Sequence, residues 1–113
     1  MILTERDQVY VEYMLECIGR IERYAGHDRA RFMQSEIVQD AVVRNLQILA
    51  ESSQRLSESA KRTQAGIDWR AIAGFRNILV HDYLGLDLDT IWPVIEHDLP
   101  QLKIVLEAMA GGA

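Results

Sequence analysis

Residues 69–83, Trp69-Arg-Ala-Ile-Ala-Gly-Phe-Arg76-Asn-Ile-Leu-Val-His81-Asp-Tyr83, decide the fold, because their spacing predicts an amphipathic helix. At about 100° per residue, one side of this helix collects Trp69, Ile72, Arg76, Leu79, Val80 and Tyr83. A guanidinium therefore lies in the middle of an apolar stripe, where a charge needs a partner or a polar ligand. A neighbouring row follows spacings of four and three and consists of Arg70, Gly74, Asn77 and His81. Two polar rows thus converge near the end of one helix.

The first half of the chain is predicted to be helical as well. Thr4 and Asp7 resemble a capping box, which starts a helix that continues to about Tyr24. A second helix is expected from about Ser35 to Ala60. Its inner face would consist of Val38, Ala41, Val42, Asn45, Leu49 and Leu56. We expect the Asn45 amide on this face to be buried and hydrogen-bonded.

Helix-capping and turn residues divide the second half. Asp68 is a good N-cap for the helix that holds the motif, and Gly85 can end that helix. Asp89 or Thr90 can cap the next helix, and Pro93 would be tolerated in the first turn of that helix.

The last segment contains a proline that an unbroken helix cannot accommodate. Residues 90–110 are therefore expected to be kinked at Pro100 or divided there, with Asp98 capping a final short helix. No β-strand is required anywhere in the chain. The predicted fold is all-α, an antiparallel bundle of four to five helices that forms a single domain over residues 1–113.

Composition indicates an ordinary globular protein. Of the 113 residues, 49% are hydrophobic and 26% are charged, which is typical of a soluble domain. Charges at Glu5, Arg6 and Asp7 argue against a signal peptide, and no run approaches the ~20 apolar residues of a membrane span. We therefore expect a cytoplasmic protein that does not enter the membrane.

The charge distribution leaves room for a nucleic-acid ligand. The net charge of −5 argues against one, but residues 20–76 hold ten basic and seven acidic residues, a local charge of +3. Ten of the twelve basic residues are arginine, which suits bidentate phosphate contacts. From charge alone, a mixed solvated surface remains the simpler interpretation.

Several familiar catalytic sites are excluded by missing residues. The chain has no G-x-x-x-x-G-K-[ST], G-x-S-x-G or H-E-x-x-H motif. His27, His81 and His97 show no ligand spacing, and the single Cys17 cannot complete a zinc site. We therefore expect no metal centre and no cofactor. Cys17 is interpreted as a buried thiol, His27 as a turn residue and His97 as a surface residue.

A polar row on the second predicted helix has two interpretations. Asp40, Arg44, Gln47 and Glu51 follow spacings of four, three and four. An exposed ladder of ion pairs accounts for this row more simply than a contribution to a functional site, although Asp40, Arg44 and Glu51 stay candidates for one.

The pattern Arg76-x4-His81-x-Tyr83 has the chemistry needed to cleave phosphodiesters. Cleaving RNA without metal needs a group of near-neutral pKa to move protons and a fixed cation for the charge that develops on phosphorus, and histidine and arginine provide these. Positions five apart on a helix differ by about 140°, so Arg76 and His81 do not lie on one regular face. They could meet if the helix loosens, if the arginine wraps around, or if two subunits bring their motifs together. On the pattern alone, an interface arginine and a half-buried histidine are as good an explanation as catalysis.

The same residues resemble a known family. Arg76-Asn77-x-x-x-His81-x-Tyr83 is similar to the signature of the HEPN superfamily, specifically of HepT-like toxins, which are ribonucleases paired with minimal nucleotidyltransferase antitoxins. The resemblance covers about residues 14–107. Supporting blocks are Arg20-Ile-Glu-Arg-Tyr24, Gln39 to Leu46, Asp68-Trp-Arg70, Gly74-Phe-Arg-Asn77, Leu86-Asp87, Ile91-Trp92 and Leu99-Pro100. One departure is Ala50-Glu51-Ser52, where many relatives have Gly-Glu-Ala.

The resemblance implies a homodimeric bundle with the two motifs in a composite RNA-cleaving cleft. Arg76 would hold the scissile phosphate and His81 would transfer protons, leaving a 2′,3′-cyclic phosphate. Asn77 would orient His81 or hold phosphate. Tyr83 resembles the tyrosine that the antitoxin adenylylates, and the attached nucleotides would bring bulk and negative charge to a site that must accept phosphate.

The sequence thus predicts a metal-independent RNA endonuclease, the toxin of a toxin–antitoxin pair. The alternative is a non-catalytic HEPN module that binds a nucleotide or a nucleotidyltransferase. The intact Arg76, His81 and Tyr83 favour the enzyme, since a binding module has no need of a histidine at that place.

Overall fold

The computed structural model describes residues 3–81 and 87–111, without the side chains of Val80 and His81. In chain order the elements are α1 (Glu5–Ala25), α2 (Arg29–Gln34), α3 (Glu36–Gln54), α4 (Glu58–Arg62), α5 (Trp69–His81), α6 (Leu88–Pro93), a π-helical turn (Val94–Asp98) and α7 (Leu99–Ala110). The described residues contain no strand, so the predicted all-α class is confirmed.

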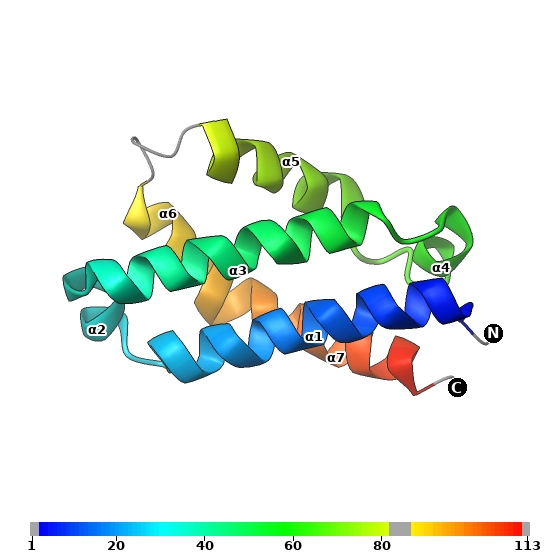
Figure 1. The fold of residues 1–113 in the computed structure, drawn as a ribbon, viewed down its shortest axis with the longest axis horizontal. Helices are drawn as coiled ribbons and strands as arrows, with labels where there is room; N and C mark the ends of the chain where they lie inside the picture. The colour runs from blue at the N-terminus through cyan, green and yellow to red at the C-terminus, as the bar shows by residue number, and fades with distance from the viewer. Residues whose placement is uncertain (1–2, 82–86, 112–113) are drawn as a thin grey trace.

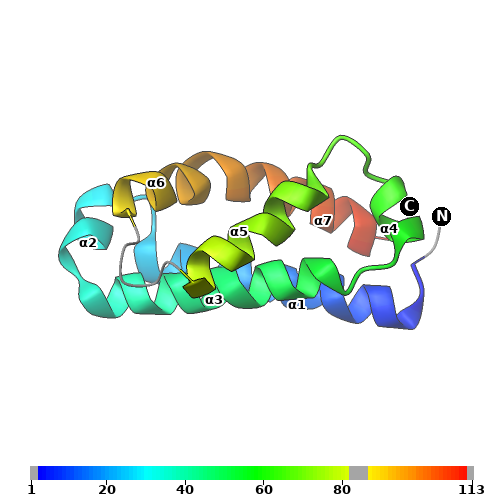
Figure 2. The ribbon, with the colours of Figure 1, turned by 90° about the horizontal axis from the view of Figure 1, so that it is seen from above.

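The four longest helices form the bundle. α1 packs against α3 on one side and α7 on another, and α5 packs along α3 (Figure 1). Each runs antiparallel to the helix it packs on, so the predicted antiparallel bundle is confirmed. The view from above shows α5 lying over α3 (Figure 2). The motif helix is therefore at the outside of the bundle, with α3 between it and α1.

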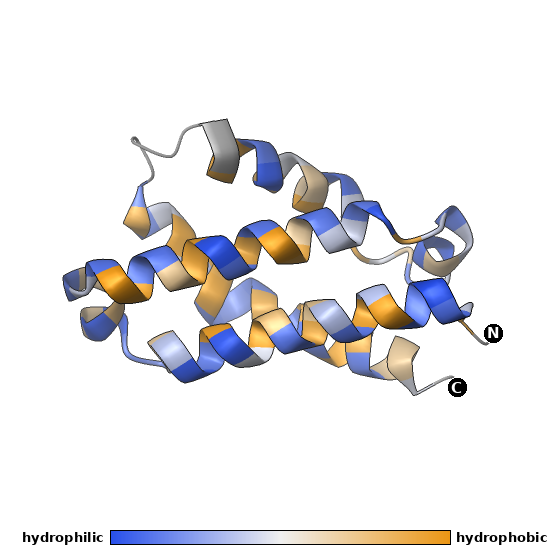
Figure 3. Cartoon of the chain, viewed as in Figure 1, coloured by the Kyte–Doolittle hydropathy of each residue, from blue (hydrophilic) through white to orange (hydrophobic). Residues whose placement is uncertain are grey.

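Helical periodicity accounts for the core. Hydrophobic and hydrophilic bands alternate along α1 and α3 (Figure 3), as expected for helices that bury one face. The fully buried apolar side chains come from nearly every element and include Val11, Met14, Ile18, Ile21, Phe32, Val42, Leu79, Ile91 and Leu106. Among the described residues, no helix is both long and apolar enough to cross a lipid bilayer.

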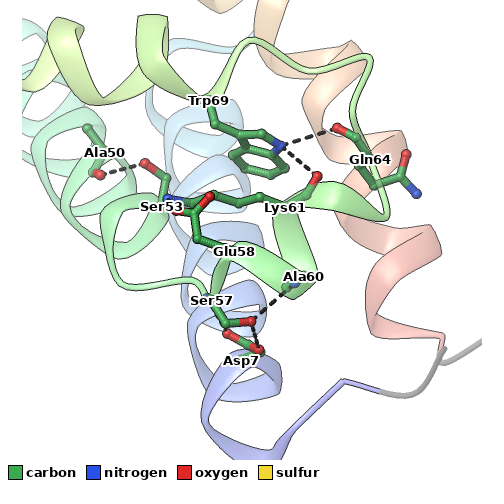
Figure 4. Close-up of polar contacts among 9 residues, drawn as sticks. All are labelled: Asp7, Ala50, Ser53, Ser57, Glu58, Ala60, Lys61, Gln64 and Trp69. Carbon is green, nitrogen blue, oxygen red and sulfur yellow. Dashed lines mark hydrogen bonds and ion pairs between the residues drawn. The ribbon is translucent and has the colours of Figure 1, made fainter.

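Asp7 ties the start of α1 to the start of α4. The Thr4 hydroxyl accepts a hydrogen bond from the Asp7 N–H, which confirms the predicted cap. The Asp7 carboxylate then accepts from the Ser57 N–H at 2.8 Å and from the Ser57 hydroxyl at 2.6 Å (Figure 4). Burial by itself raises the pKa of Asp7, but hydrogen bonds from Ser57 and Thr4 outweigh it, so its pKa lies below the ordinary value.

The same contact corrects the expected end of the second helix. α3 ends at Gln54, and a separate short helix, α4, begins after Ser57, whose hydroxyl accepts from the Ala60 N–H. The continuous helix predicted to Ala60 was therefore wrong. Ser57 caps α4 and binds the distant Asp7, and this tertiary partner does not show in local spacing.

Other boundaries also differ from the prediction. α2 was not expected, although Asp28 caps it by accepting from the Arg31 N–H at 3.0 Å. α6 is capped by Asp87 rather than by Asp89 or Thr90, so Pro93 ends this helix and does not lie in its first turn. Gly85, the expected end of the motif helix, lies outside the described residues.

A π-helical turn precedes Pro100 near the end of the chain. The Leu99 N–H bonds the Val94 carbonyl, five residues back, and Pro100 follows within the first turn of α7. The predicted division of residues 90–110 at Pro100 is confirmed in this form, because the wider turn changes the hydrogen-bond register just before a residue without an N–H. Asp98 makes no side-chain capping bond, so that part of the prediction was wrong.

Candidate functional site

The N-terminal end of the motif helix α5 is fixed by two local anchors. Asp68 accepts a hydrogen bond from the Ala71 N–H at 3.0 Å, as its predicted capping role requires. The Trp69 indole N–H points at the Gln64 carbonyl at 3.2 Å and the Lys61 carbonyl at 3.3 Å (Figure 4). The aromatic ring therefore joins α5 to the connection that precedes it.

Side chains on α5 follow the two rows predicted from the sequence. Leu79 is fully buried, and Trp69, Ile72 and Arg76 are half-buried along the same stripe. The described side chains of the second row belong to Arg70 and Asn77, and both residues are exposed, as is Gly74 between them. An added Cβ at Gly74 would meet no atom within 4 Å, so this position is open in the single chain.

Arg76 on α5 faces Glu51 on α3. Its Nη2 lies 3.5 Å from the Glu51 Oε1, and the two side chains are 34% and 45% exposed. The Nε of Arg76 is covered and has no hydrogen-bond partner among the described residues. The guanidinium is therefore a half-buried cation with one loose ion pair, and its Nη donors rather than the covered Nε are the ones that an anionic ligand could reach.

The polar row of α3 borders α5. The Gln47 side-chain amide donates to the Leu79 carbonyl at 3.2 Å, and the Gln54 amide donates to the Ala73 carbonyl at 3.4 Å. Glu51 lies between them in sequence and pairs with Arg76. The interpretation of the row as an exposed ladder was therefore wrong for Gln47 and Glu51, because α5 packs along this side of α3.

The remaining two members of that row differ from Gln47 and Glu51. Asp40 and Arg44 are exposed, and neither makes a side-chain hydrogen bond within the described residues. Gln54 was not part of the predicted row, although its spacing of three residues from Glu51 was a signal that could have found it.

The catalytic pairing predicted from the sequence extends beyond the described residues. The backbone of His81 belongs to the last described turn of α5, but its side chain is outside the description, and so is all of Tyr83. Arg76 and the exposed Asn77 are the two predicted site residues whose side chains the structure places.

An apolar pocket of about 430 Å³ lies among α3, α5 and α7. Its walls include Leu49, Ile72, Phe75 and Leu102, and its lining contains two carboxylates, Asp68 and Asp98, but no arginine or lysine. Two carboxylates without a nearby cation would repel an RNA phosphate, so this pocket does not suit the ligand that Arg76 could bind.

The other titratable groups singled out in the sequence lie apart from Arg76. Cys17 is buried, and burial raises the pKa of its thiol, as expected for an inert core cysteine. His97 is exposed beside Glu96, and His27 is exposed in the turn after α1, as predicted. The Asn45 amide is buried and its Nδ2 donates to the Ala41 carbonyl at 2.9 Å, as predicted, but its Oδ1 has no hydrogen-bond partner among the described residues.

Comparison with known proteins decides the family. The profile of the ribonuclease HepT-like family matches residues 14–109. The chain belongs to this family. A longer protein of Methanocaldococcus jannaschii, named for a gamma-glutamylcyclotransferase and an RNase, is 35% identical over 98 residues, which span 85% of this chain and 44% of that protein. A Thermococcus cleftensis protein named "Probable ribonuclease HepT" is 34% identical over 95 residues, covering 83% of this chain and 86% of the relative.

The fold agrees with a solved HEPN toxin. The tri-AMPylated toxin of Shewanella oneidensis, in complex with its MNT antitoxin, superposes with a TM-score of 0.72 at 26% identity. The similarity covers 94% of this chain and 99% of that one. The bundle described above is therefore the HEPN toxin fold, and the resemblance found in the sequence is confirmed.

Proposed function

We propose that this HepT-like protein is a metal-independent RNA endonuclease and the toxin of a toxin–antitoxin pair. The observation that carries the proposal is Arg76, a half-buried cation on an apolar stripe, held by one loose contact to Glu51. Such a guanidinium can exchange a carboxylate for a phosphate at low cost, because both partners are still partly solvated. Membership of a ribonuclease family supports the same assignment.

In the proposed mechanism, Arg76 binds the scissile phosphate and stabilises the charge that develops in the transition state. His81 moves the proton from the ribose 2′-hydroxyl and returns one to the leaving 5′-oxygen, which leaves a 2′,3′-cyclic phosphate. Asn77, exposed one turn before His81, holds phosphate or orients the histidine. Both proton transfers in this mechanism are carried out by a protein side chain, and neither requires a metal ion.

The proposed assembly is a cytoplasmic homodimer regulated by a nucleotidyltransferase antitoxin. Two subunits related by a two-fold axis would bring Arg76 of one protomer near His81 of the other, which removes the difficulty of their ~140° separation on one helix. The antitoxin would attach AMP to Tyr83. The similar Shewanella oneidensis toxin, AMPylated and in complex with its MNT antitoxin, supports this form of regulation.

The decisive experiment compares RNA cleavage by purified wild type, His81→Ala and Arg76→Ala in EDTA, with total RNA from the protein's own cell as substrate. Each substitution is expected to lower the cleavage rate by roughly two to four orders of magnitude while circular dichroism stays unchanged. A wild type that cuts no RNA, or a His81→Ala variant that cuts equally well, would leave the non-catalytic HEPN module as the better assignment. A strict need for divalent metal would contradict the mechanism.

A further inference from the structure

Three side chains of α3 line up along α5 and contact it at regular intervals. In order along α3, Gln47 donates to the Leu79 carbonyl, Glu51 pairs with Arg76, and Gln54 donates to the Ala73 carbonyl. Because the helices are antiparallel, the first of these contacts is nearest the end of α5 that carries His81. Two side chains of α3 thus bind the backbone of α5 at two positions, the Leu79 and Ala73 carbonyls.

Gln47 and Gln54 bind parts of α5 that lie at different distances from His81. Leu79 lies two residues before His81, within one helical turn of it, whereas Ala73 lies eight residues before it. Gln47 is half-buried, with a donor–acceptor distance of 3.2 Å, whereas Gln54 is exposed and its distance is 3.4 Å. The shorter and better shielded bond is the one beside the catalytic end.

Among the described residues, α3 is the main packing partner of α5, so few other contacts in this part of the chain fix the position of the motif. At the His81 end the described ties are the fully buried Leu79 side chain and the Gln47 bond to the backbone of the same residue. An apolar contact is non-directional, but a hydrogen bond to a carbonyl sets both the height and the rotation of the turn.

We propose that Gln47 is a positioning residue for RNA cleavage, which acts through the Leu79 carbonyl to hold the α5 turn that carries His81. The proposal rests on the ribonuclease function proposed above. Gln47 touches neither Arg76 nor the substrate in this role. Its amide fixes the turn that carries His81 in the position where proton transfer is productive. A misplacement on the order of 1 Å can lower the rate about a hundredfold.

The test compares Gln47→Met with Gln54→Met. Methionine keeps the length and helix preference of glutamine but has no N–H, so each variant removes one amide-to-carbonyl bond between the same two helices. We expect Gln47→Met to lower kcat about tenfold with KM changed less than twofold. Gln54→Met should match wild type in both constants. The two melting temperatures should lie within a few degrees of each other, since each variant loses one bond of the same kind.

A second measurement does not depend on activity. Hydrogen exchange followed by mass spectrometry should be faster in Gln47→Met for peptides that cover Leu79–His81, and unchanged there in Gln54→Met. Equal exchange in the two variants would overturn the positioning role even if wild type cuts no RNA. If exchange changes as expected but kcat does not, or if both variants lose kcat alike, Gln47 is merely structural. A wild type without cleavage refutes the proposed function separately.

Discussion

Replacing Glu51 by glutamine should make RNA bind more tightly. The Glu51 carboxylate lies 3.5 Å from the Arg76 Nη2, so it competes with any phosphate for the guanidinium. At that distance two unit charges interact by about 1 kcal/mol in water. Ion pairs between partly exposed side chains, here 34% and 45% exposed, are worth about 0.2–1 kcal/mol net because solvent and side-chain entropy offset the attraction, so about 1 kcal/mol is the upper figure. The substitution keeps the size of the side chain and removes the competing charge, so the Kd for RNA should fall about fivefold.

The assay is fluorescence anisotropy with a labelled single-stranded RNA in the non-cleaving His81→Ala background. Adding Glu51→Gln should lower the Kd about fivefold at 50 mM salt, and the gain should shrink towards 1 M salt as charges are screened. In a further Arg76→Ala background the gain should vanish, because its cause is the pair. An unchanged or higher Kd would refute the reasoning. So would a gain that persists without Arg76.

Three further outcomes are expected. Wild type should scatter light as a dimer of the 12.9 kDa chain at micromolar concentration, and Gly74→Leu, whose Cβ would meet no described atom within 4 Å, should be monomeric; a monomeric wild type contradicts the composite site. Incubation with the antitoxin and ATP should add AMP and abolish cleavage, whereas Tyr83→Phe should gain no mass; labelling that survives this substitution excludes Tyr83 as the acceptor. Because hydrogen bonds lower the pKa of Asp7, its stabilisation is present above the unfolded value of about 3.9 and is lost as pH falls through the folded pKa. In urea unfolding, Asp7→Asn should cost about 2 kcal/mol at pH 7 and progressively less below pH 4, and equal stability at pH 7 would be inconsistent with this account.

The sequence by itself determined the helices and the faces that they bury. The spacing of apolar residues placed Leu79 inside and Asn77 outside, as the structure has them. It put Arg76 in the middle of the apolar stripe, and the structure has this side chain half-buried there. The caps at Thr4 and Asp68 were readable because a capping bond joins residues three apart. The family was readable from the motif and its flanking blocks, and the family profile matches residues 14–109.

Only the tertiary structure decided which polar groups meet across helices. α3 ends at Gln54 and α4 begins after Ser57, which binds Asp7, fifty residues away in the chain. Gln47 and Glu51 contact α5 rather than water because α5 packs on their side of α3. Periodicity assigns a side chain to a face of its own helix, but the neighbour that covers this face is chosen by the packing of the whole bundle, and a polar side chain at its edge takes whichever partner that packing supplies.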